Sequence, residues 1–132
     1  MDVIASCIAA FFPDASFDYI LDGGSFSSLD LSKALPELAR ALKPGGTLVV
    51  SDVSRTHPYM RLGLKHPFHR QIEWHKHQHP RVWASLLESV GFSAVTYHWA
   101  TQWRYPQLPR FLTDNSFAVQ LYSSQFVLHA RK

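Results

Sequence analysis

The chain contains little cysteine, and it lacks a long hydrophobic run. Cys7 is its one cysteine, so an internal disulfide is impossible and a reducing compartment fits best. The apolar run near the start spans about ten residues, too few for a bilayer-spanning helix. Asp2 stands where a signal peptide would carry Lys or Arg. We therefore expect a cytoplasmic protein without a membrane span.

Charge of either sign is also scarce. Charged residues make up 17% of the chain, hydrophobic residues 46% and aromatic residues 14%, whereas about 25% charged is usual for soluble domains. A length of 132 residues allows one domain with a core and is too short for two. The net charge of +3 is too small on its own to indicate a nucleic-acid binder. The low charge implies that some apolar surface needs a partner.

Two strands and a helix are predicted in the first half of the chain. FDYILD (17–22) is a short apolar run between turn signals, typical of a buried strand. Leucines recur at helical spacing from Leu31 to Leu42, and Pro36 among them predicts a late start or a kink. KPGG ends that helix, and TLVVSD (47–52) then runs apolar without alternation. Such a run predicts a parallel strand covered on both faces.

The second half of the chain predicts a helix and further strands. Val82, Trp83 and Val90 lie on one face of a helix that starts at Pro80 and ends at Gly91. SAVTYHW (93–99) and the final QFVLHARK are strand-like, and FAVQLY (117–122) is a possible extra strand. The alternation of strands and helices predicts an α/β fold.

The stretch between these halves, 53–79, has no clean period, and we interpret it as an irregular insertion. Between residues 53 and 81 lie six lysines and arginines against the single acid Glu73, together with six of the eight histidines. In a strand, His75, His77 and His79 would share one face and could bind a metal. No Cys pair or H-E-x-x-H pattern accompanies them, so a solvated histidine-rich loop and no metal site are favoured.

These segments together carry a family resemblance. FFPDASFDYILD followed by LPELARALKPGGTLVVSDV resembles the second half of the class I S-adenosylmethionine-dependent methyltransferases, of the methyltransferase type 11 kind. PRVWASLLESVGFSAVTYHW is similar to the next helix and strand six of that family, and QFVLHARK to its closing antiparallel strand. The resemblance implies a partial Rossmann-like, three-layer fold with a mixed sheet of strands four, five, seven and six.

The glycine-rich cofactor loop of that family, G-x-G-x-G after strand one, is absent from this chain, as is the acid that holds the ribose. The glycine pairs Gly23-Gly24 and Gly45-Gly46 follow later strands. The resemblance implies S-adenosylmethionine as the cofactor, but without the loop and the acid this chain alone is expected to bind it weakly or not at all. Whether the chain is an active enzyme stays open.

The resemblance also implies site residues. Asp22 ends strand four, where it would orient the nucleophile or merely cap a turn, and Gly23, Gly24 and Ser25 would lie against the methionine end of the cofactor. Ser6 and Cys7 fall beside the expected adenine position, and Asp52 closes strand five at the substrate pocket. DGGSFSSL and HPYMR are similar to segments of protein-lysine methyltransferases that act on a translation elongation factor, which adds His57 and Tyr59 as substrate contacts.

Two functions follow from these observations. The first is the carboxyl-terminal half of a methyltransferase domain acting on a small molecule or a protein; the alternative is a non-catalytic methyltransferase-like interaction module. The single incomplete domain would comprise a remnant of strand three (1–16), the strand–helix–strand unit (17–52), the insertion (53–79) and the closing part (80–132). With strands one and two missing, strand 17–22 would be an exposed edge, so a homodimer or a partner chain is expected there. Nucleic acid and membrane partners are not expected.

Overall fold

The computed structural model describes residues 12–26, 29–54, 62–64, 77–100 and 125–132. Its elements are β1 (Phe17–Asp22), α2 (Leu31–Ala41), β2 (Leu42–Val53), α4 (Pro80–Ser89), β3 (Ser93–Ala100) and β4 (Gln125–Arg131). Each of them lies where the sequence predicts a helix or a strand. The possible strand at 117–122 and most of the predicted insertion at 53–79 lie outside the described residues.

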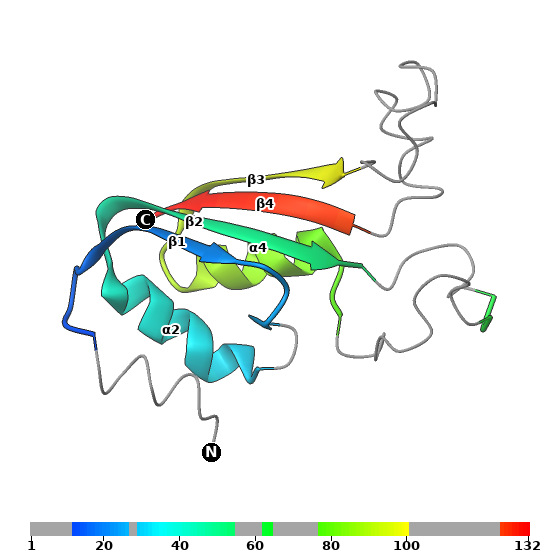
Figure 1. Cartoon of the computed structure of the whole chain (residues 1–132), viewed down its shortest axis with the longest axis horizontal. Helices are drawn as coiled ribbons and strands as arrows, with labels where there is room; N and C mark the ends of the chain where they lie inside the picture. Colours follow the sequence, from blue (N-terminus) through cyan, green and yellow to red (C-terminus); the bar gives the residue numbers. More distant parts are fainter. Residues whose placement is uncertain (1–11, 27–28, 55–61, 65–76, 101–124) are drawn as a thin grey trace.

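The strands form one mixed sheet in the order β1-β2-β4-β3 (Figure 1). β1 and β2 run parallel, and β4 runs antiparallel to both of its neighbours. The last strand in sequence therefore lies inside the sheet, with β1 and β3 at the two edges of its described part. This is the α/β sheet that the family resemblance implies.

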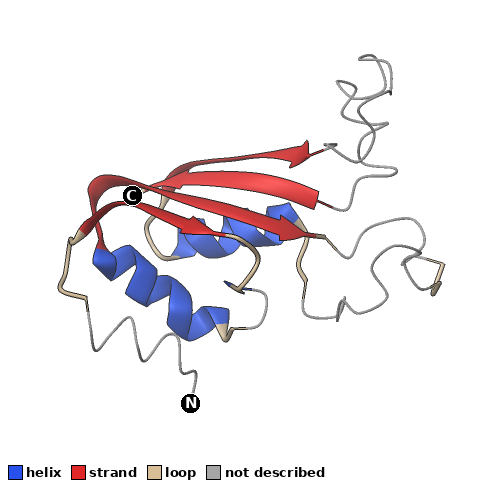
Figure 2. Cartoon of the chain, viewed as in Figure 1, coloured by secondary structure: helices blue, strands red, loops and turns tan. Residues whose placement is uncertain are grey.

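Both described helices cover the same face of the sheet (Figure 2). Burial along β2 alternates to match: Leu48, Val50 and Asp52 are buried, whereas the residues between them are at least partly exposed. On the opposite face of β1, Tyr19 and Leu21 are 71% and 76% exposed. Among the described residues, helices therefore cover one face of β2, whereas the sequence predicted cover on both; an unbroken apolar run does not reveal which faces are occupied.

The core lies between the sheet and the two helices. Each helix contributes leucines, and α4 adds Trp83, whose ring centroid lies 6.2 Å from that of Phe26. The members of the core with no exposed surface include Leu42, Leu48, Val50, Trp83, Leu87, Phe126 and Leu128. Burying one such side chain stabilises the fold by about 1.5–3 kcal/mol. Neither described helix is long and apolar enough to cross a bilayer.

Helix α2 runs through Pro36 and begins at Leu31, so the predicted late start is wrong. The Asp30 side chain accepts a hydrogen bond from the Ser32 N–H, which stabilises the first turn. Proline cannot donate to the carbonyl four residues earlier, that of Ser32. Both Ser32 and Pro36 are exposed, so water can solvate this carbonyl and the helix continues.

The KPGG segment does more than end α2. The helix stops at Ala41, and β2 begins at once with Leu42, five residues before the predicted start. The pairing of β1 with β2 shifts register between Phe17 and Tyr19, so that the four residues KPGG form an irregularity in the strand. Gly45 donates to the Lys132 carbonyl, and Lys132 donates in turn to the Gly46 carbonyl, each at 2.9 Å. The segment thus ties β1, β2 and the end of β4 together.

Helix α4 begins and ends as the sequence predicts. Pro80 occupies the first turn, and Gly91 after the helix has a φ of +97°, a left-handed conformation that favours glycine. Trp83 and Leu87 face the core, but Val82 is 43% exposed, so its predicted place on the buried face is wrong. The apolar stripe of this helix is narrower than its sequence suggests.

Candidate functional site

Two buried acids meet where β1 and β2 end. Asp22 is the last residue of β1, Asp52 lies next to the last residue of β2, and they are only 6% and 5% exposed. In open α/β sheets, ligands bind at the carboxyl ends of parallel strands. The acids therefore mark the candidate site.

Asp22 holds the turn that follows β1. One carboxylate oxygen accepts a hydrogen bond from the Gly24 N–H at 3.0 Å, and the other accepts from the Ser25 N–H at 3.0 Å and from the Ser25 hydroxyl. A Cβ at Gly24, where φ is +101°, would lie 3.6 Å from the Ser51 carbonyl oxygen. Asp22 thus fixes a turn that rests on the end of β2, and its assignment to catalysis stays a prediction.

The Asp52 carboxylate has different hydrogen-bond partners from that of Asp22. Its Oδ1 accepts from the Val53 N–H at 2.7 Å and lies 3.1 Å from Nδ1 of His77, while Oδ2 is buried without a hydrogen-bond partner in the part of the chain that the structure describes. Burial raises the pKa of the Asp52 carboxyl above its ordinary value, and the charge of Asp22 raises it further. The Val53 N–H and His77 oppose this rise. His77 therefore partly offsets the effect of burial on the Asp52 carboxyl.

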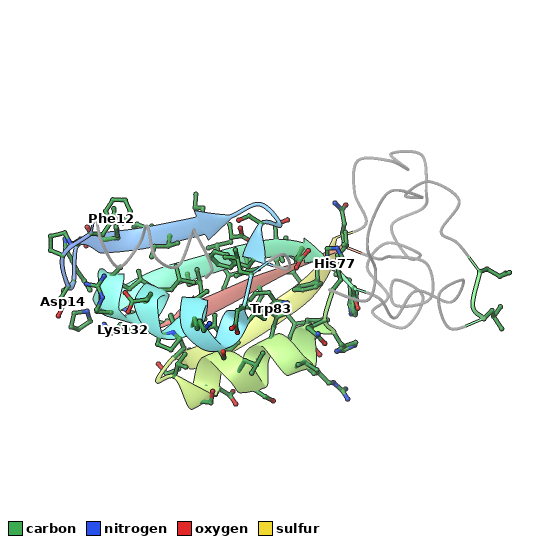
Figure 3. All side chains as sticks on the ribbon, turned by 90° about the horizontal axis from the view of Figure 1, so that it is seen from below. Phe12, Asp14, His77, Trp83 and Lys132 are labelled. Atoms are coloured by element: carbon green, nitrogen blue, oxygen red, sulfur yellow. The ribbon has the colours of Figure 1, made fainter. Side chains whose placement is uncertain are left out.

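His77 reaches this acid from the segment before α4. Figure 3 shows it at the end of the sheet, beside the carboxyl end of β2. Two residues later, the His79 ring accepts a hydrogen bond from the Arg81 N–H at 3.1 Å and lies edge-on to Trp99. His77 and His79 are half-buried and structurally engaged, so their interpretation as a solvated loop is wrong.

The structure brings together part of the predicted site. Asp22, Gly23, Gly24, Ser25 and Asp52 share one end of the sheet. The other predicted residues, Ser6, Cys7, His57 and Tyr59, lie outside the described residues, and so does His75. No group of three or more potential metal ligands occurs among the residues that the structure describes. Sequence reasoning missed the role of His77, because its partner is 25 residues away along the chain.

Known proteins that resemble this chain include methyltransferases. Residues 3–50 match the model of the methyltransferase domain family. No curated protein matches the sequence. Among solved structures, an S-adenosylmethionine-dependent methyltransferase from Archaeoglobus fulgidus superposes with a TM-score of 0.65 at 16% identity, covering 97% of this chain and 64% of that one. The matched stretch of sequence and the fold of the chain are thus both similar to those of methyltransferases.

Two further structures support the same fold assignment. A possible histamine N-methyltransferase from Thermotoga maritima gives a TM-score of 0.62 at 19% identity, over 92% of this chain and 59% of its own. A phosphoethanolamine N-methyltransferase from Haemonchus contortus, solved with S-adenosyl-L-methionine, gives 0.60 at 18% identity, over 92% and 34%. These structures confirm the methyltransferase fold, and the match of residues 3–50 supports the family resemblance. The chain spans a third to two-thirds of the length of these methyltransferases.

Among the described residues, those of the Asp22 turn fit one end of the family cofactor. The Asp22 turn, with Gly23 and Gly24 exposing backbone at a strand end, suits the methionine portion of S-adenosylmethionine. No G-x-G-x-G segment occurs in the sequence to cradle the remainder. The assignment of these residues to cofactor binding stays a prediction.

Proposed function

We propose that this chain forms the carboxyl-terminal half of a methyltransferase catalytic domain, which transfers a methyl group from S-adenosylmethionine to a small molecule or a protein. The observation that carries the proposal is the convergence of the Asp22 turn and Asp52 at the carboxyl ends of two parallel strands. The cofactor supplies an electrophilic methyl group on a sulfonium. The protein then needs chiefly to hold donor and acceptor in line, which proximity and orientation achieve.

The rigid construction of this strand end supports the proposal. Both oxygens of Asp22 are engaged within its own turn, so the backbone of Gly23 and Gly24 is held in place before a ligand arrives. A preorganised turn loses little conformational entropy on binding. No specific observation favours the alternative of a non-catalytic interaction module.

The experiment that tests this function is a titration of the full chain with S-adenosylmethionine, followed by amide NMR. We expect weak binding, with a dissociation constant near 1 mM, about −4 kcal/mol, and resonance changes concentrated at Gly23, Gly24 and Ser25. Asp22→Ala should abolish those changes, because the turn loses its acceptor. Asp18→Ala, at an exposed position of the same strand, serves as the matched control and should preserve them.

Changes confined to residues away from the Asp22 turn, or none at millimolar cofactor, would contradict the proposed function. A dissociation constant in the low micromolar range, about −8 kcal/mol, would instead contradict only the expected weakness. The first result would test where the cofactor binds, and the second would test only how tightly it binds.

We also propose that a second copy of this chain pairs with β1. Among the described strands β1 lies at a sheet edge, and it contains neither Lys nor Pro, the residues that commonly block edge pairing. Tyr19 and Leu21 add two large exposed side chains on its open face. Two identical edges can pair antiparallel about a twofold axis, which satisfies both sets of backbone groups.

For this pairing we expect a dimer at tens of micromolar in light scattering, and Leu21→Lys should convert it to a monomer. The lysine places a charge on the edge without disturbing the core, because Leu21 is 76% exposed. Val82→Lys, on the exposed side of α4, is the control and should leave the dimer intact. A wild-type chain that stays monomeric throughout a dilution series, like its Leu21→Lys variant, would disprove the pairing.

A further inference from the structure

Two histidines lie on the face of the sheet that the described helices leave uncovered. His129 is an exposed residue of β4, and its neighbours Leu128 and Ala130 are buried. His98 is exposed on β3, next to Trp99, which packs against the core. Successive side chains of a strand point to opposite faces. Both imidazoles therefore project away from α2 and α4, which Figure 2 shows together on the other face.

The pairing of β3 with β4 brings these two rings together. His129 pairs with Thr96, and His98 pairs with Val127, so the two histidines are diagonal neighbours across the antiparallel ladder. Their rings stack, with centroids 5.9 Å apart and planes inclined by 18°. Two side chains from strands distant in the sequence thus place their ring nitrogens at one point on the open face.

The ring nitrogens of the pair are not engaged by the described protein. Neither imidazole has a hydrogen bond or an ion pair to another residue in the part of the chain that the structure describes. The side chains beside the pair on this face are neutral: Thr96 on β3, Val127 on β4 and Val49, which pairs with His129 from β2. The nitrogens are therefore open to a ligand from solution.

Arg131 is the charged residue that shares this face of β4, two positions beyond His129. Its Nε donates to the Gly45 carbonyl at 3.3 Å, so its guanidinium is engaged with the KPGG segment. Its charge repels a cation bound at the histidines. Because Arg131 is exposed, water and salt screen that repulsion.

The spacing of the two rings suits one metal ion. An imidazole nitrogen lies about 2.0–2.1 Å from Zn²⁺, so the centroids of two rings on one ion lie about 5–6 Å apart. The separation of His98 and His129 falls within that range. The rings need only turn about χ2, a torsion with a broad energy minimum in histidine. Imidazole suits Zn²⁺, Cu²⁺ and Ni²⁺, whereas Mg²⁺ and Ca²⁺ prefer oxygen ligands.

We propose that His98 and His129 together bind one divalent ion of a late transition metal, and that this ion clamps β3 to β4. Water fills the coordination positions that face solvent. β3 lies at an edge of the described sheet and joins it through β4 alone, so a bridge between these two strands secures the edge. Asp52 lies on the helix-covered face, so the metal site is separate from the candidate methyl-transfer site.

The test measures how fast diethyl pyrocarbonate modifies each histidine of the full chain, read by peptide mass spectrometry with and without Zn²⁺. At a Zn²⁺ concentration about ten times the dissociation constant, modification of His98 and His129 should slow together by about tenfold. Mg²⁺ at the same concentration should protect neither. Because each histidine is read separately, the other histidines of the sequence do not obscure the result.

A substitution of one histidine tests whether the two act as a pair. His98→Ala should remove most of the Zn²⁺ protection of His129, because a single imidazole holds the ion far more weakly than two held together. Thr96→Ala is the matched control, since it shortens an exposed neighbour on the same face, and it should preserve the protection of both rings. Zn²⁺ that protects neither ring, or a His129 that stays fully protected in His98→Ala, would overturn the site.

The clamp is tested by amide hydrogen exchange of β3. Zn²⁺ should slow exchange along β3 in the wild-type chain and leave it unchanged in His98→Ala, because only the paired site links the two strands. Exchange that Zn²⁺ does not alter in the wild-type chain would overturn the clamp. Neither measurement uses S-adenosylmethionine, so its result is independent of the methyltransferase proposal.

Discussion

Trp83→Ala is expected to lower the free energy of unfolding by about 3–5 kcal/mol, because it empties the largest fully buried position in the described core. The indole fills the space between α4 and the sheet and lies against Phe26, 6.2 Å away between centroids. Native domains are stable by about 5–15 kcal/mol, so this one change removes a large part of the total. Urea denaturation followed by circular dichroism measures the loss.

Val82→Ala is the matched control for that experiment. It shortens the neighbouring side chain of the same helix at a position that is 43% exposed. A substitution of this kind usually changes stability by no more than about 0.5 kcal/mol. Equal losses from the two variants would show that α4 does not pack through Trp83 as described.

Gly46→Ala is expected to destabilise the fold by about 1–3 kcal/mol through overpacking. A Cβ at this position would lie 2.9 Å from the Lys43 carbonyl oxygen and 3.1 Å from that of Asp18. Both are backbone atoms, one in the same KPGG segment and one in β1, so relief requires the KPGG backbone to rearrange and β1 to move away. The second glycine of KPGG is thus needed because its own segment and β1 both approach it closely.

Gly23→Ala provides the comparison for Gly46. A Cβ at Gly23 would meet nothing within 4 Å, so we expect its free energy of unfolding to stay within about 0.5 kcal/mol of the wild type. Thermal denaturation of both variants in parallel compares their losses of stability. A stability loss at Gly23 as large as that at Gly46 would contradict the close approach of the strands.

Much of this fold was predictable because its signals are local. PDAS and GGS delimit β1, and Pro80 and Gly91 delimit α4, since proline and glycine restrict or extend the backbone conformations available at those residues. The one-sided burial of β2 was not predictable from TLVV. Side chains alternate along a strand, but an apolar residue on each side does not reveal whether a helix covers it.

Part of the candidate site was also predictable from the sequence, and part of it was not. Asp22 and Asp52 were found because each closes a predicted strand, and parallel strands bring their carboxyl ends together. His77 was set aside as one of several histidines in an aperiodic segment. Its contact with Asp52 depends on how that segment returns toward α4, and no spacing rule describes such a path.

The interior position of β4 has a consequence for the order in which the molecule can fold. Val50 of β2 pairs with Leu128, and Tyr97 of β3 pairs with that same residue. During synthesis, β2 and β3 therefore emerge from the ribosome well before the strand that joins them. The unit formed by β1, α2 and β2 can assemble early, but the described sheet closes only after β4 arrives, and pairing over such sequence separations is slow. Until then, the edges of β2 and β3 that will pair with β4 are open to association with other chains.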